Sequence, residues 1–291
     1  MGTDYLLERL LKEKDPLLHQ RVKDSVFVLE TMLNAFLVRF PQFTDHSILH
    51  SLDVINFCNE IIREENAKKL SAEEIYVILM AAYLHDIGMG INEKDYKEFS
   101  EEIAKEFSDF FKMNENNDSA GVVRRYHNEF SGLFIKKYAQ LFDIPSDDLT
   151  FAIIQTSRGH RKTDLYDEKE YPDIRTENGV VRTSYTAAII RLADEIDVAS
   201  DRNPELLFES IEHTDKDSIM AFGSHESIRR VEVTEDAIIL YTKPISQEYV
   251  QVIEEIAEKV QETLDYCREV TENRTDIGIT QKKVQIKPIN S

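Results

Sequence analysis

One segment constrains the fold of this chain more than any other: an apolar stretch that begins at Ser71 and ends at a His-Asp pair. Its first residues, SAEE, form a capping box, in which Ser71 and Glu74 each accept a hydrogen bond from the other's backbone N–H. The run IYVILMAAYL follows, and the glycines of IGMG are typical of a helix C-terminus. The sequence therefore predicts an apolar helix whose C-terminal end carries His85 and Asp86.

The segments on both sides of this helix also show helical spacing of apolar residues. Residues 15 to 40 are expected to form a helix, because Asp15 is a suitable cap, Pro16 fits the first turn and the apolar positions recur with helical periodicity. After the break PQFTDH, a second helix is expected through HSILHSLDVINFCNEII. Further helices are expected at 97–113, 119–142, 147–159 and 183–199, with loops such as DEKEYPDIRTENG between them.

The pattern changes after about residue 205. The stretch RRVEVTEDAIILYT alternates apolar and polar residues around a TED turn, which indicates a hairpin. An amphipathic helix at about 246–272 and a last strand at KKVQIKPI follow. We therefore expect a mostly α fold, with a helical domain at residues 1–203 and a small α/β region at residues 204–291. The second region carries no catalytic motif, so packing or a dimer surface is its expected role.

Composition excludes several classes of function. The net charge of −20, from 55 acidic and 35 basic residues, argues against a protein that coats nucleic acid, although one nucleotide or strand end could still enter a basic pocket. The two cysteines, Cys58 and Cys267, have neither zinc-ligand spacing nor the density of a disulfide scaffold. Walker, GxSxG and dinucleotide-binding motifs are absent from the sequence. Signal and membrane-spanning stretches are absent too, so a cytoplasmic location without membrane contact is expected.

The His-Asp pair is the strongest chemical feature. Two ionisable groups at the end of an apolar helix are costly to bury, and a divalent cation would offset that cost because neutral imidazole and carboxylate are metal ligands. A solvated pair at a helix end is the alternative, since a bare His-Asp dipeptide is common. Two further features favour the metal: His46 and His50 share one helical face at i and i+4, and Asp194 directly follows the apolar run IIRLA.

This order of residues resembles the HD-domain metal-dependent phosphohydrolase superfamily over roughly residues 40 to 203. The matching elements are HSLDV, which makes His50 rather than His46 the first ligand, the His85-Asp86 doublet, and LAD ending at Asp194. The resemblance implies an all-α HD domain with a divalent ion, Mn, Fe, Zn, Co or Mg, held by these four residues. The phrases FPQFTDHSILHS, YLHDIGMG, RGHRK and RLADEID are also similar to HD hydrolase domains of bacterial conflict and signalling systems.

Two more histidines lie between the doublet and the last aspartate. Members of the superfamily with two metals, such as the HD-GYP cyclic dinucleotide phosphodiesterases, carry extra histidines in this interval. The resemblance therefore implies that His127 and His160 bind a second ion, bridged to the first by Asp86. The chain lacks the GYP element and an adjacent histidine pair, so it does not resemble a cyclic di-GMP enzyme of that type. Contact with phosphate or water at a one-metal site stays open for both histidines.

The activity implied by the resemblance is hydrolysis of a phosphoester or phosphoanhydride, with a nucleotide as the expected small-molecule partner. Asp86 would hold the metal, while Arg161 and Lys162 beside His160 would contact phosphate. His46 would donate a proton or contact phosphate, or would only cap its helix. A nucleotide-binding regulatory module without turnover is the alternative, although the full set of four ligands disfavours it. A homo-oligomer also stays open.

Overall fold

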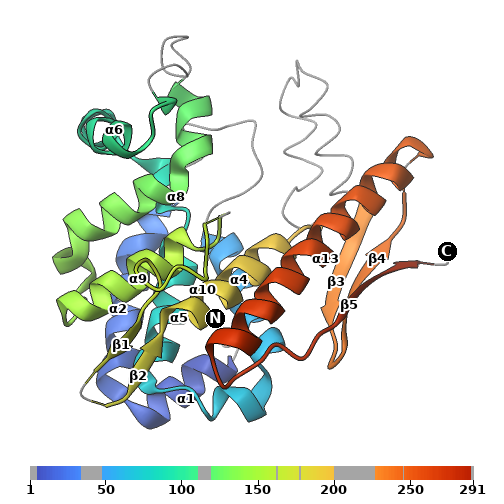
Figure 1. Ribbon diagram of the computed structural model, residues 1–291, viewed down its shortest axis with the longest axis horizontal. Helices are drawn as coiled ribbons and strands as arrows, with labels where there is room; N and C mark the ends of the chain where they lie inside the picture. Colours follow the sequence, from blue (N-terminus) through green and yellow to red (C-terminus); the bar gives the residue numbers. More distant parts are fainter. Residues whose placement is uncertain are drawn as a thin grey trace.

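The computed structural model describes residues 5–33, 48–110, 119–161, 163–176, 178–199, 227–244 and 246–289. The fold is mostly α with a small C-terminal α/β part, as the sequence predicted (Figure 1). Helix α5 (Ala72–Leu84) lies at the centre and is buried from Glu73 to Leu84. The helices that pack against it are α1 (Leu6–Lys14), α2 (Pro16–Leu33), α4 (Ile48–Ala67), α9 (Asp147–Arg158) and α10 (Thr183–Glu195).

The predicted capping box starts α5. The Ser71 hydroxyl accepts from Glu74 N at 3.0 Å, and Ser71 N donates to the Glu74 carboxylate at 2.9 Å. Because α5 is apolar on every side, burial all round is its stable environment. The helix ends at Leu84, and the short 3-10 helix η1 (Ile87–Gly90) follows directly after the His-Asp pair.

Helix η1 packs closely against α8 (Ser119–Tyr138). Gly88 N donates to the Ser131 hydroxyl at 2.9 Å, and a Cβ at Gly88 would clash with the backbone of His127 and Ser131. Glycine at this position therefore allows the segment that carries Asp86 to approach the helix that carries His127. The helix α8 continues into η2 (Ala139–Phe142), so the two together cover the helix expected at 119–142.

Some local expectations need correction, and one helix was not expected at all. Helix α6 (Glu93–Glu106) begins earlier than expected, because the Asn92 side chain caps it by accepting from two backbone N–H groups at 2.9 Å. The expected loop DEKEYPDIRTENG contains strand β1 (Asp173–Arg175), which pairs antiparallel with β2 (Val180–Arg182). Helix α1, for which the sequence analysis made no prediction, buries three leucines. Residues 34–40 and 111–113 of two expected helices lie outside the described residues.

The C-terminal strands form a sheet in the order β3-β4-β5. Strands β3 (Ile228–Val233) and β4 (Ala237–Thr242) form the predicted hairpin, and β5 (Lys283–Pro288) pairs parallel with β4. Helix α13 (Glu248–Arg274) packs against β5 and also along α10 (Figure 1). Helix α13 therefore connects the sheet to the helix that carries Asp194.

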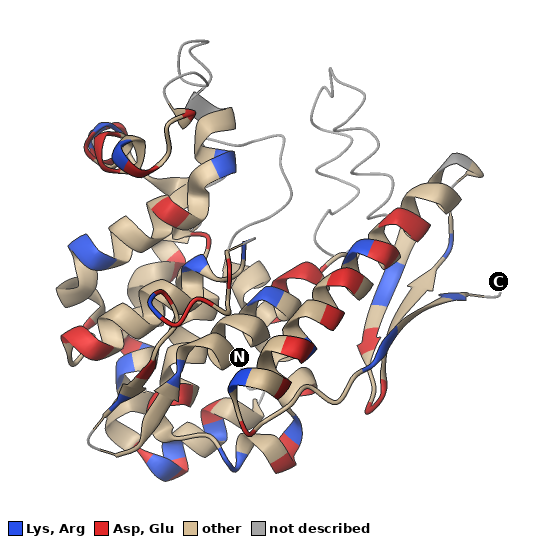
Figure 2. Cartoon of the chain, viewed as in Figure 1, with Lys and Arg blue, Asp and Glu red and all other residues tan. Residues whose placement is uncertain are grey.

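Helix α13 carries more acidic than basic side chains, as Figure 2 shows. Among the described helices, none alone has the length and apolar character needed to cross a membrane. The segments Ala72–Gly90 and Glu93–Glu106, bent by 101° at their junction, meet that criterion of length and composition only as a pair.

Candidate metal centre

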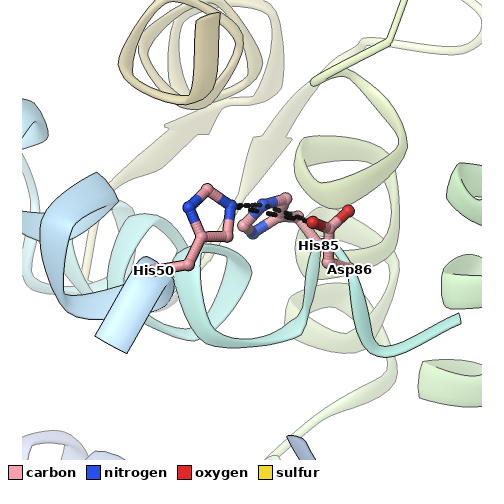
Figure 3. A group of neighbouring side chains, drawn as sticks. All are labelled: His50, His85 and Asp86. Carbon is pink, nitrogen blue, oxygen red and sulfur yellow. Dashed lines mark hydrogen bonds and ion pairs between the residues drawn. The ribbon is translucent and has the colours of Figure 1, made fainter. Parts of the chain in front are cut away.

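The four residues of the HD pattern converge on one buried site. His50 comes from α4, His85 and Asp86 follow α5, and Asp194 lies in the last turn of α10. The His50 Nε2 atom lies 3.1 Å from His85 Nε2, 3.6 Å from Asp86 Oδ2 and 3.3 Å from Asp194 Oδ1. Figure 3 shows the rings of His50 and His85 and the Asp86 carboxylate facing one another. The structure thus brings together residues that lie on three separate helical segments.

The two additional histidines face the other oxygen of the same aspartate. His127 Nε2, from α8, lies 3.3 Å from Asp86 Oδ1, and His160 Nε2, after the end of α9, lies 3.6 Å from it. The two Nε2 atoms are 2.7 Å apart. Asp86 is therefore shared, with Oδ2 facing the pair of His50 and His85, and Oδ1 facing the pair of His127 and His160.

The ring orientation of each histidine leaves Nε2 directed into the site. In every ring the Nδ1 atom lies within hydrogen-bond distance of an oxygen acceptor. These acceptors are Asp197 Oδ2 for His50 at 2.6 Å, Ala82 O for His85 at 3.0 Å, Arg124 O for His127 at 2.7 Å and Ser157 O for His160 at 2.6 Å. A carbonyl oxygen only accepts, so it favours the tautomer with the proton on Nδ1 and a lone pair on Nε2.

This donor set fits divalent cations. Ligand atoms about 2.1 Å from a metal are separated by about 3.0 Å at a 90° angle and about 3.4 Å at a tetrahedral angle. The separations of 3.1 to 3.6 Å among His50, His85, Asp86 Oδ2 and Asp194 lie within this range or slightly above it. The two separations from Asp86 Oδ1, 3.3 and 3.6 Å, do so as well, while the 2.7 Å between the two histidines would have to open by a few tenths of an ångström. Neutral imidazole with carboxylate suits Zn, Mn, Fe and Co.

The site's electrostatics favour the ligand forms of most of these groups. Burial would raise the pKa of Asp194, but its close contacts with the rings of His50 and His85 hold that pKa well below its usual range. Burial lowers the pKa of His160 to about 3, helped by the neighbouring His127 and His85. Burial also lowers the pKa of His85, but the carboxylates of Asp86 and Asp194 outweigh it, so the net pKa is raised. A proton and a metal ion therefore compete for His85.

Two further residues hold candidate ligands or their segments in place, and the sequence analysis assigned no role to either of them. Asp197, 2% exposed, fixes the ring of His50 through its Nδ1. Its position three residues after Asp194 in an apolar segment was the available signal. Arg191 is also buried and donates to the carbonyl oxygens of Gly159 and Thr163.

The predicted phosphate-binding residues are only partly described. Arg161 is exposed directly after His160. Burial lowers the pKa of His127, and the positive charge of Arg161 lowers it further. By contrast, Arg125 pairs with Asp109 at 2.8 Å. His46 and Lys162 lie outside the described residues.

Comparison with known proteins identifies this arrangement. The HD-CE family model matches residues 40–273, which include Asp86 and the five other candidate ligands. The chain belongs to the HD-CE family. It thus has an HD-type domain, and its buried His/Asp cluster fits an HD-type metal site. The HD-CE match continues through β3 and β4 and nearly to the end of α13, so it includes most of the C-terminal α/β part. No curated protein and no solved structure matches the chain.

Proposed function

We propose that this HD-CE protein is a metal-dependent phosphohydrolase that cleaves a phosphoester or phosphoanhydride of a nucleotide. The observation that carries the proposal is the placement of Asp86 between two histidine pairs, one facing each carboxylate oxygen. Hydrolases with two metals use such a shared ligand to hold both ions at one phosphate. Asp194 completes the first position, at 3.3 Å from His50 and 3.6 Å from His85.

Bound divalent ions would polarise a phosphoryl oxygen and lower the pKa of a coordinated water. The chain itself supplies the other functions. Asp197 holds His50 in the tautomer whose Nε2 faces the site, and carbonyl oxygens do so for the other three histidines. Arg161 would bind a phosphate oxygen pair and stabilise the charge that develops during cleavage. In this proposal His46 donates a proton, or contacts phosphate, and Lys162 adds a second basic contact.

The charge of the protein favours a small substrate. With a net charge of −20, a long polyanion would be repelled over most of the surface. Arg161, the exposed residue that directly follows His160, would supply a local positive charge at the site. A nucleotide with one to three phosphates needs only such a local contact, so it suits the site better than a duplex.

The test begins with protein stripped of metal by a chelator and reloaded with Mn, Fe, Zn, Co or Mg. Phosphate release is measured on a panel of linear and cyclic nucleotides and short oligonucleotides. We expect release from at least one nucleotide, with loss of activity in Asp86→Ala and reduced activity in Arg161→Ala. Arg125→Ala is the matched control, because this exposed arginine pairs with Asp109. Binding of metal and nucleotide without any release would instead indicate a regulatory module.

A further inference from the structure

The second histidine pair depends on a segment whose described residues form no helix or strand. His160 follows the C-cap residue Gly159, and Arg161 and residues 163–172 then continue without regular secondary structure. We call residues 159–171 the His160 segment. The candidate ligand in this segment, His160, is oriented by the carbonyl oxygen of Ser157 in α9, at 2.6 Å. The rest of the segment needs other contacts to hold His160 opposite Asp86.

Arg191 provides contacts from α10. Its Nε donates to Gly159 O at 2.7 Å, and its Nη2 donates to Thr163 O at 2.8 Å and to the Thr163 hydroxyl at 3.0 Å. One planar guanidinium thus joins the residues on both sides of His160. The side chain is 7% exposed, so these charge-assisted bonds are protected from competing water.

Residues of helix α13 also contact the His160 segment. The ring of Tyr266 lies 5.0 Å from the Arg191 guanidinium, and its hydroxyl accepts from Leu165 N at 2.8 Å. Arg274, at the end of α13, donates to Leu165 O at 2.9 Å and to Tyr171 O at 3.0 Å. The His160 segment is therefore fixed between α10 and α13.

The first histidine pair does not use these contacts. His50 is held by Asp197, and His85 is held by the carbonyl of Ala82 within its own helix. A change in how α13 meets the His160 segment would therefore reach His160 without directly displacing either of these rings.

We propose that Arg191 and Tyr266 are positioning residues for His160, so that α13 sets the affinity of the second metal position. This inference rests on the two-metal form of the proposed function. It gives the C-terminal part of the HD-CE region a role at the site: docking of α13 completes the second position. Removal of outer contacts of this kind typically weakens metal binding about tenfold to a hundredfold.

The test measures Mn binding to the metal-free full-length chain by titration calorimetry and by electron paramagnetic resonance. The signal of a coupled Mn pair differs from that of a single Mn ion, so the two positions are distinguished without measuring activity. Arg191→Lys keeps the charge but cannot bridge Gly159 and Thr163 with one planar group. Tyr266→Phe removes only the hydroxyl group, and it is the test variant if Arg191→Lys does not fold.

Arg182→Lys is the matched control. Arg182 is a partly buried arginine that binds Glu74 at 2.7 Å, near the beginning of α5. Glu74 lies about 16 Å along the helix from His85. Its substitution should lower stability while leaving both Mn affinities unchanged.

We expect the wild-type chain to bind two Mn ions. The second affinity should fall at least about tenfold in Arg191→Lys and about threefold in Tyr266→Phe, with the first affinity unchanged. Two unchanged affinities in both variants would overturn the inference and leave the two-metal function standing. An equal fall in the first and second Mn affinities of Arg191→Lys would also overturn the inference, as would the same fall in Arg182→Lys. Either result would mean that Arg191 only stabilises the fold. A wild-type chain that binds one Mn would overturn this inference and the two-metal form of the proposed function, and a chain that binds none would overturn the metal-dependent function itself.

Discussion

The contact between Gly159 and Ala187 offers a sharp test of how His160 is placed. Gly159 has φ −64°, which every residue adopts, so a larger side chain there would meet only a steric cost. A Cβ at Gly159 would lie 2.5 Å from the Cβ of Ala187 on α10. Carbon atoms in contact are separated by about 3.5 to 4.0 Å. In Gly159→Ala, the end of α9 must therefore move about 1 Å away from α10.

Such overpacking costs about 1–3 kcal/mol of the free energy of unfolding. The movement also carries His160, whose Nε2 lies 3.6 Å from Asp86 Oδ1. Metal-ligand distances tolerate only about 0.2 Å. We therefore expect Gly159→Ala to lower stability in chelator and, in addition, to lose most of the stabilisation that Mn gives at the second position.

Urea unfolding with chelator and with Mn measures both effects, and Ala187→Gly provides the compensating change. Glycine within α10 costs about 1 kcal/mol by itself. The double variant should be less destabilised than the sum of the two single variants, by about 1–2 kcal/mol. If Gly159→Ala unfolds at the same urea concentration as wild type, or if the two costs simply add, the reasoning about this contact is wrong.

Three further outcomes follow from the site. Asp197→Asn should weaken metal binding about tenfold in competition with a chelator, because the charged partner of His50 is lost; unchanged affinity would refute that support. In chelator, lowering the pH from 7.5 to 5 should reduce the free energy of unfolding of wild type by about 2 kcal/mol more than that of His160→Gln. The reason is that unfolded His160 takes up a proton near its ordinary pKa of 6.5, whereas folded His160, with a pKa of about 3, does not. Parallel pH curves for the two proteins would contradict the buried, neutral His160. Asp86→Ala should lose metal and turnover together, whereas Arg161→Ala should keep its metal and slow phosphate release; loss of metal from Arg161→Ala would reverse these roles.

The sequence predicts the helices whose burial leaves a recognisable pattern of apolar residues. Helix α5 has both a capping box and an uninterrupted apolar run, and the structure shows both features as expected. Strands β1 and β2 are only three residues each, and Val180 is 38% exposed, so they leave no alternating pattern to detect. The early start of α6 depends on the Asn92 cap, a local feature that apolar spacing does not report.

At the candidate site, too, some features are visible in the local sequence and others depend on the folded structure. The candidate ligands stand out in the sequence because they are ionisable residues at the ends of apolar helices or within them. Their supporting residues depend on contacts between distant segments: Asp197 meets His50 across 147 positions, and Arg191 meets Gly159 across 32. Nothing in the local sequence around Arg191 indicates that it binds carbonyl oxygens. The arrangement of the C-terminal helix beside the site likewise required the folded structure.

The most direct test of the account is an anomalous diffraction map of crystals loaded with Mn. The central claim is that Asp86 is shared between two metal positions. The account predicts two anomalous peaks about 3.5–4 Å apart, one on each side of the Asp86 carboxylate. The first peak should lie among His50, His85 and Asp194, and the second between His127 and His160. A single peak touching only one histidine pair, or no peak beside Asp86, would contradict the claim.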